Sequence, residues 1–148
     1  MAITQAMCTS FKVEILDGIH AFGTTVVRAD TTADTFYLAL YTDSASLDAS
    51  TTAYETGGET TGTGYTTGGQ VLETVAPTSS GTTAYLDFAD ETWTTATITA
   101  RGAMIYNQTQ GNKAVAVLDF GGNKTSTAGD FTVVFPTADS ATAIIRIA

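Results

Sequence analysis

The sequence of 148 residues is poor in the residue types that build most metal, disulfide and catalytic sites. It contains one cysteine, Cys8, and one histidine, His20. A single cysteine excludes an internal disulfide, and this pair cannot supply the four Cys or His ligands of a structural zinc site. No metal or other cofactor is therefore expected, and stability must come from packing or from contacts with other copies of the chain.

Basic residues are absent from the middle of the chain. Residues 29–100 contain ten acidic residues and no Lys or Arg, and the whole chain has a formal charge of −9. Proteins that bind nucleic acids neutralise phosphates with Lys and Arg. The charge therefore argues against DNA or RNA as a partner.

Long apolar runs are also lacking. No stretch approaches the roughly 18 apolar residues of a membrane-spanning helix, and residues 1–10 lack the basic and apolar regions of a signal peptide. With 43% hydrophobic and 14% charged residues, the composition is typical of a globular protein. We expect a single domain over residues 1–148 with neither membrane insertion nor Sec-type secretion.

The first periodic segment predicts an amphipathic helix over about residues 9–22. Phe11, Ile15, Ile19 and Phe22 follow one another at spacings of four, four and three, which places them on one face. Gly18 lies inside this helix and lowers its stability. The apolar face packs either on the chain's own sheet or on a partner.

Later segments change to the pattern of β-strands. They are rich in β-branched and aromatic residues and are bounded by Gly, Asn, Asp, Ser or Pro. Ile98 and Ala100 alternate with polar neighbours, and Gly102 is a candidate for a bulge or bend. The chain is predicted to be mainly β, an antiparallel β-sandwich or barrel of about seven strands. These strands are expected at 35–42, 70–77, 83–89, 95–107, 113–120, 131–136 and 142–148.

The run GGETTGTGYTTGG at residues 57–69 contains six glycines in thirteen positions. A phosphate-binding P-loop requires G-x-x-x-x-G-K-[ST], and a dinucleotide fingerprint requires G-x-G-x-x-G between a strand and a helix. This run meets neither requirement, and its only charged residue is the acidic Glu59, whereas a phosphate site needs a basic residue. It is interpreted as a long loop that folds over itself and is anchored by apolar contacts of Tyr54 and Tyr65. The loop is expected to contact another protein.

Nucleophilic catalysis has weak support. A triad would require His20, at the end of the predicted helix, to meet a distant Ser and Asp, and the Ser79–Ser80 pair lies in a turn without a nucleophile motif. The segment at 43–48 offers oxygen ligands but lacks the spacing of a calcium loop.

A glycosidase, which needs two carboxylates near an aromatic ring that stacks on the sugar, is a stronger alternative. Asp87, Asp90 and Glu91 lie close to Trp93 in the sequence. Strand alternation, however, places Leu86 and Phe88 on one face and Asp87 on the other. We therefore interpret these acids as a solvated rim rather than an active site.

The chain resembles small Thr- and Gly-rich structural proteins of tailed bacteriophage virions. The resemblance extends from about Cys8 to the last residue, and rests on the segments CTSFKVEILDGIHAF, FYLALYT, GTGYTTGGQVL, TARGAMIYN, KAVAVLDFGGNKT, FTVVFPTAD and AIIRIA. It implies a non-enzymatic part of an assembled particle, made in the bacterial cytoplasm and located in the virion.

The leading hypothesis from this resemblance is a capsid decoration (cement) protein that binds the major capsid protein as a homo-oligomer, with a trimer expected. A tail, baseplate or fibre component bound to tail proteins is the alternative. From other classes, a carbohydrate-binding module would use Trp93 with Tyr54 or Tyr65, and a glycosidase would use Asp87 and Glu91. The predicted interface residues are Phe11, Ile15, Ile19, Tyr54 and Tyr65.

Overall fold

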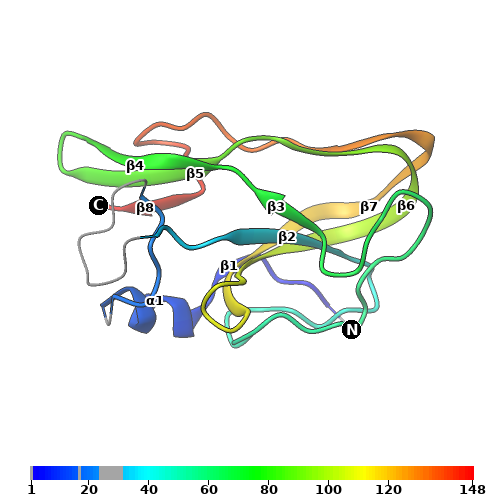
Figure 1. The fold of residues 1–148 in the computed structure, drawn as a ribbon, viewed down its shortest axis with the longest axis horizontal. Coiled ribbons are helices and arrows are strands. Elements are labelled where there is room, and N and C mark those ends of the chain that lie inside the picture. Colours follow the sequence, from blue (N-terminus) through cyan, green and yellow to red (C-terminus); the bar gives the residue numbers. More distant parts are fainter. Residues whose placement is uncertain (1, 17, 24–31) are drawn as a thin grey trace.

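The fold is built around one long hairpin of the strands β6 (Glu91–Asn107) and β7 (Lys113–Val133). The hairpin pairs from Glu91↔Val133 to Asn107↔Lys113, and its register shifts at several points, one of them between Ala100 and Gly102. The hairpin bends, so that parts of the same two strands run through the lower and the upper part of the molecule (Figure 1). The bulge predicted at Gly102 is therefore confirmed.

The computed structural model describes residues 2–16, 18–23 and 32–148. They form an antiparallel sheet of five strands in the order β1-β7-β6-β2-β3 and a second sheet of three strands in the order β4-β5-β8. The other elements are β1 (Ala6–Met7), α1 (Thr9–Leu16), β2 (Phe36–Tyr41), β3 (Gln70–Leu72), β4 (Thr74–Ser80), β5 (Thr83–Phe88) and β8 (Ile145–Ile147). The chain is thus mainly β, as the sequence predicted, and a β-sandwich.

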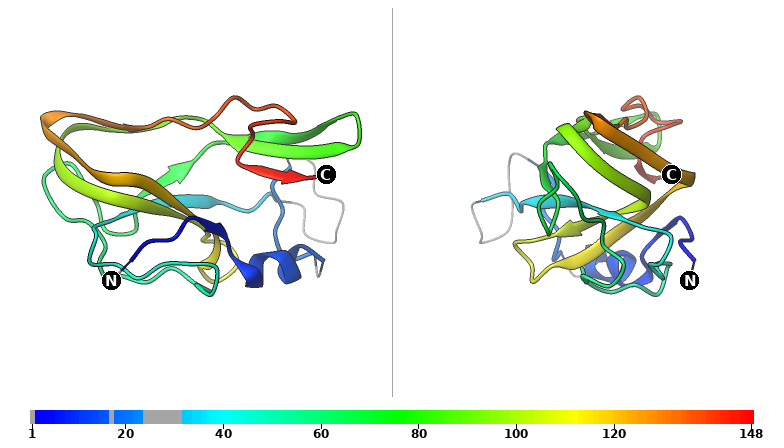
Figure 2. Two further views of the ribbon diagram at one scale, coloured as in Figure 1. Left: turned by 180° about the vertical axis from the view of Figure 1, so that it is seen from behind. Right: turned by 90° about the vertical axis from the view of Figure 1, so that its right-hand side faces the viewer.

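Strand boundaries differ from the predicted ones in two places. The predicted strand at 70–77 is divided, since β3 joins the larger sheet and β4 the smaller one. The predicted strands at 113–120 and 131–136 are parts of the single strand β7. Figure 2 shows this strand curving along the edge of the molecule without interruption.

The helix is shorter than predicted. α1 ends at Leu16 rather than at residue 22, and Gly18 follows it with a φ of +69°. This left-handed conformation is typical of the glycine that terminates a helix. The backbone N–H of Gly18 donates to the carbonyl of Ile15 at 3.0 Å.

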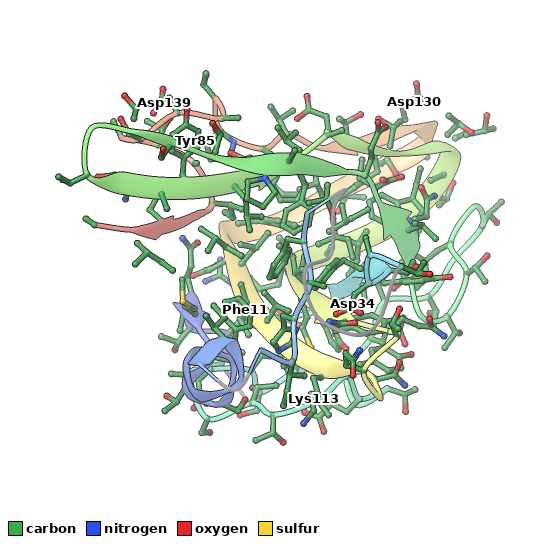
Figure 3. All side chains as sticks on the ribbon, turned by 60° about the vertical axis from the view of Figure 1, so that its left-hand side comes forward. Phe11, Asp34, Tyr85, Lys113, Asp130 and Asp139 are labelled. Atoms are coloured by element: carbon green, nitrogen blue, oxygen red, sulfur yellow. The ribbon has the colours of Figure 1, made fainter. Side chains whose placement is uncertain are left out.

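The core lies between the two sheets and α1. β2 is buried along almost its whole length because it lies between β6 and β3. Phe22 and Phe36 stack with ring centroids 4.2 Å apart, and Phe11 meets Phe22 edge-on at 5.9 Å. The apolar face predicted from residues 11–22 therefore packs at least partly on the chain's own core. Figure 3 shows Phe11 pointing from α1 into the interior.

Candidate interaction surface

The feature most accessible to a partner is a projecting pair of strands. Residues 74–86 of β4 and β5, here called the β4–β5 arm, form a hairpin that extends to one end of the molecule (Figure 1). Thr78, Ser79 and Ser80 are consecutive and all exposed. Because successive side chains of a strand point to opposite faces, both faces of the arm are open to solvent near its tip.

The register sorts the side chains of the arm into two faces. Ser79 pairs with Ala84, which pairs with Ile147 of β8, so these three residues share one face. Thr78 pairs with Tyr85, which pairs with Arg146, and this row lies on the opposite face. Ile147 is 57% exposed. The first face is uncharged, with hydroxyl and apolar groups, whereas the second carries a cation.

The outer edge of the arm is protected against strand addition. β4 has no further strand beside it within the described part of the chain. Pro77 has no backbone N–H, and the register shifts between Val75 and Thr78. Proline and bulges are common means of preventing edge-to-edge pairing. The accessible surface of the arm is therefore its faces rather than its β4 edge.

A segment without regular strands, residues 134–144, passes over the outer side of β5 (Figure 1). Asp90 Oδ1 accepts the Phe135 N–H at 2.8 Å at its start, and Asp87 Oδ2 accepts the Ile144 N–H at 3.3 Å at its end. Asp139 Oδ1 accepts the N–H groups of Ala141 and Thr142 in its middle. Figure 3 places Asp139 and Tyr85 at the same end of the molecule.

Asp87 is the main correction to the sequence-based picture of these acids. Strand alternation predicts a solvated side chain, but only 1% of Asp87 is exposed because residues 134–144 cover that face. Burial raises the pKa of Asp87 above its usual value of about 3.8, and bonds from the N–H groups of Phe88 and Ile144 oppose this shift. A carboxylate used in this way holds the backbone and does not face a substrate.

The other member of the proposed carboxylate pair, Glu91, is half-buried at the start of β6. Burial also raises the pKa of Glu91. A glycosidase needs two carboxyl groups that reach the same glycosidic bond from solvent. The burial of Asp87 contradicts its assignment as one of them.

Trp93 is completely buried, with 0% of its surface exposed. Its ring lies 6.1 Å from that of Tyr65 and 6.3 Å from that of Phe131, measured between centroids. A platform for stacking a sugar must be open to solvent, so the assignment of Trp93 to a carbohydrate-binding surface is wrong.

The glycine-rich run is organised by one acidic side chain. Glu59 accepts hydrogen bonds from the Tyr54 hydroxyl at 2.7 Å, the Tyr65 hydroxyl at 2.6 Å and the Gly68 N–H at 2.7 Å. The Tyr65 hydroxyl in turn accepts the N–H of Leu40 in β2 at 3.0 Å. The acidic residue that counts against phosphate binding thus ties the loop to the sheet, a role that no local pattern of residues indicates.

Close contact with the sheet explains why the run is rich in glycine. A Cβ on Gly69 would lie 1.8 Å from the Leu38 carbonyl oxygen, and one on Gly62 would lie 2.2 Å from the Thr97 carbonyl oxygen. Both glycines also have positive φ angles, of 80° and 142°. The loop is laid directly on the backbones of β2 and β6, and a side chain at either position would displace it.

The five predicted interface residues are not equally available. Phe11 is 0% exposed and belongs to the core, so its assignment to an interface is corrected: in the folded chain no partner reaches it. Ile15, Ile19, Tyr54 and Tyr65 are half-buried. Contact of these four residues with a partner stays a prediction.

His20 lies beyond the end of α1, in a polar cluster on the edge of the aromatic core. Its Nδ1 atom is 2.9 Å from the side-chain nitrogen of Asn107, which also donates to Asp34 at 2.8 Å. Gln110 donates to the other oxygen of Asp34 at 3.1 Å. These contacts join the chain around residue 20 to the turn after β6, which gives this histidine a structural role.

Two further properties concern the described residues only. They include no cluster of three or more His, Cys, Asp or Glu side chains suited to a metal ion. Among them no helix has the length and apolar character required to cross a membrane. In the segment at 43–48, Asp43 accepts a bond from Asn123 at 3.1 Å, while Asp48 bonds to Ser50.

Comparison with protein-family models, with curated protein sequences and with solved structures found no match.

Proposed function

We propose that this protein is a structural component of a tailed bacteriophage virion, and that it decorates the outer surface of the head by binding the major capsid protein. The observation that carries the proposal is the β4–β5 arm, which is ordered as strands although its tip is exposed on both faces. β8 pairs with β5 at residues 84–86, so the arm is held in place as part of a three-stranded sheet. A projecting arm of this kind is well suited to docking on a larger assembly.

The positions of the candidate reactive groups support a non-enzymatic role. Asp87 and Trp93 are buried, and Glu59 is engaged with two tyrosines and a backbone N–H. Each of these side chains holds the fold together. The resemblance in sequence to small virion proteins points to the same class.

The net charge of −9 is compatible with a place on the outside of a head, since the packaged DNA lies on the other side of the shell. Stabilisation would follow from mass action. A protein that binds the mature lattice but not its disrupted form stabilises the lattice by about 2.7 kcal/mol per site when its free concentration is 100 times Kd. No chemical step is required.

Immunogold labelling of intact virions tests the proposal. Antibodies raised against the chain are expected to label heads, and virions from a phage mutant unable to make the chain serve as the control. Label confined to tails would replace decoration by the tail or baseplate alternative. Virions without label would contradict a virion role altogether.

The oligomeric state is tested separately. Light scattering coupled to size-exclusion chromatography is expected to give a trimer, a common way of multiplying weak contacts on a symmetric shell. A monomer at all concentrations would contradict the trimer but would leave the labelling result unaffected.

A further inference from the structure

We propose that Trp93, Tyr65 and Tyr54 form a pathway that carries a one-electron oxidation from the buried indole to the protein surface, and that the carboxylate between the two tyrosines accepts the protons. This carboxylate belongs to Glu59. The oxidation begins when the indole absorbs ultraviolet light and loses an electron to a soluble electron acceptor. The pathway returns an electron to the indole before its ring reacts irreversibly. This redox activity is additional to the proposed structural function and does not depend on where the chain is located.

The first step is an electron transfer between two rings in the core. Trp93 is the only tryptophan, and its surface is completely buried. Two of the described aromatic rings lie against it, Tyr65 at 6.1 Å and Phe131 at 6.3 Å between centroids. A phenol is oxidised far more easily than the ring of a phenylalanine. The electron that Trp93 loses is therefore replaced from Tyr65, whose ring is stacked at 30° to the indole.

Oxidation of a phenol at neutral pH requires a base for its proton, and Glu59 is in position for both tyrosines. Burial is the main cause that raises the pKa of Tyr54 and of Tyr65, so both are neutral phenols at pH 7. The Tyr65 hydroxyl donates to Oε1 of Glu59 at 2.6 Å, and the Tyr54 hydroxyl donates to Oε2 at 2.7 Å. Both phenol protons are within the reach that proton transfer to a base requires.

Electrons and protons balance at each step. Oxidised Trp93 takes an electron from Tyr65, whose phenol proton moves to Oε1 of Glu59, which leaves a neutral phenoxyl radical and a carboxylic acid. Tyr54 then gives an electron to Tyr65 and its own phenol proton to Oε2, while the first proton returns from Oε1 to Tyr65. A soluble one-electron reductant finally supplies an electron to Tyr54, which takes its proton back from Oε2.

Tyr54 is the end of the pathway that a reductant can reach. Its side chain is half-buried and lines a polar hollow of about 340 Å³, in which Ser46, Ser50 and Thr52 contribute hydroxyl groups. Glu55 lines the same hollow, so an uncharged reductant such as hydroquinone suits it better than an anion does.

Laser flash photolysis of the purified chain tests the pathway. A flash at the red edge of the tryptophan absorption, where tyrosine does not absorb, removes an electron from Trp93 in the presence of a soluble electron acceptor. Transient absorption then follows the indole and phenoxyl radicals, which absorb at different wavelengths. In the wild-type chain the phenoxyl signal is expected to rise as the indole signal decays.

Tyr65→Phe keeps the ring but removes the group that gives up the electron and the proton. Tyr106→Phe is the matched control, since the Tyr106 ring stacks on that of Tyr54 but its hydroxyl donates to the Gly68 carbonyl. We expect the lifetime of the indole radical to increase at least about tenfold in Tyr65→Phe and to change less than about twofold in Tyr106→Phe. Circular dichroism checks that the variants are folded.

Glu59→Gln tests the proton transfer separately from packing. The amide keeps an oxygen that accepts hydrogen bonds but is not a base at pH 7, and a positioned base accelerates proton transfer by about 10²–10⁴-fold. We expect the rise of the phenoxyl signal to slow at least about a hundredfold in this variant, and the rise in the wild-type chain to be slower in D₂O than in H₂O. A merely structural role of Glu59 would produce no isotope effect.

Tyr54→Phe tests the exit. Hydroquinone should remove the phenoxyl signal at least about tenfold more slowly in this variant than in wild type, and equal rates would overturn the assignment of Tyr54. Absence of a phenoxyl signal in the wild-type chain, or an indole lifetime unchanged in folded Tyr65→Phe, would overturn the pathway. If Tyr65→Phe does not fold, an equally fast phenoxyl rise in wild type and in Glu59→Gln overturns it instead. None of these outcomes affects the labelling of virions.

Discussion

Removal of the Glu59 carboxylate should loosen the whole glycine-rich loop. The substitution Glu59→Ala deprives the hydroxyls of Tyr54 and Tyr65 and the N–H of Gly68 of their common acceptor. A hydrogen bond to a charged group contributes about 1.5–3 kcal/mol. Glu59 and both tyrosines are half-buried, so water replaces part of what is lost. We expect the free energy of unfolding to fall by about 2–4 kcal/mol.

Urea unfolding followed by fluorescence measures this loss. Trp93 is the only tryptophan, is fully buried and lies 6.1 Å from Tyr65 between ring centroids, so it reports on the loop directly. With a urea dependence of about 2 kcal/mol per M, the expected loss lowers the unfolding midpoint by about 1–2 M.

Glu55→Ala is the matched control, because Glu55 is an exposed glutamate in the same stretch. It should change the stability by less than about 0.5 kcal/mol. Tyr65→Phe, alone and combined with Glu59→Ala, completes a double-mutant cycle that isolates the bond between these two residues. Equal unfolding midpoints for Glu59→Ala and Glu55→Ala would refute the view that this carboxylate holds the loop.

Three further predictions concern buried groups. Phe11→Ala should lower the free energy of unfolding by about 3–5 kcal/mol, because Phe11 is in the core; chemical denaturation checks this, and a fully stable variant defective only in assembly would contradict it. The pKa of Asp87 is raised in the folded chain, so the stability that Asp87 contributes is present below about pH 3.8 and is lost as pH rises through the folded-state pKa. The variant Asp87→Asn should therefore gain stability relative to wild type between about pH 3 and 7. Thermal midpoints of the two proteins that stay parallel over this range would count against the reasoning. Burial is the main cause that raises the pKa of Tyr106 to about 12, whereas the pKa of an unfolded tyrosine is near 10. The stability that Tyr106 contributes should therefore persist to about pH 10 and decline toward pH 12. A Tyr106→Phe variant whose thermal midpoint falls at alkaline pH as much as that of wild type would exclude this cause.

The elements that can be predicted from the sequence are those whose pattern is local. The apolar run of β2 and the alternation around Ile98 indicate strands because burial there follows from the period of the side chains. The continuity of β7 through residues 121–130 has no such signal, since this stretch is rich in glycine and polar residues. It is held as a strand by pairing with β6, including the contact of 2.9 Å between the hydroxyls of Thr99 and Thr125.

The incorrect predictions at the level of sites have a common physical origin. Strand alternation assigns Asp87 to solvent, but it cannot reveal that residues 134–144 fold back over that face. Trp93 has polar neighbours in the sequence, which suggests a surface platform, but Tyr65 and Phe131 arrive from distant parts of the chain to cover it. Burial by segments remote in sequence leaves no local signal, whereas the lack of charge in the β4–β5 arm is visible in the sequence itself.

The bend in the β6–β7 hairpin has a consequence for how the protein comes apart. Each of these strands runs through both the upper and the lower part of the molecule, so the two parts share one pair of strands, whose ladder of backbone hydrogen bonds is broken by register shifts. Loss of pairing in one part therefore removes support from strands that continue into the other part. Heating should therefore give a single sharp transition.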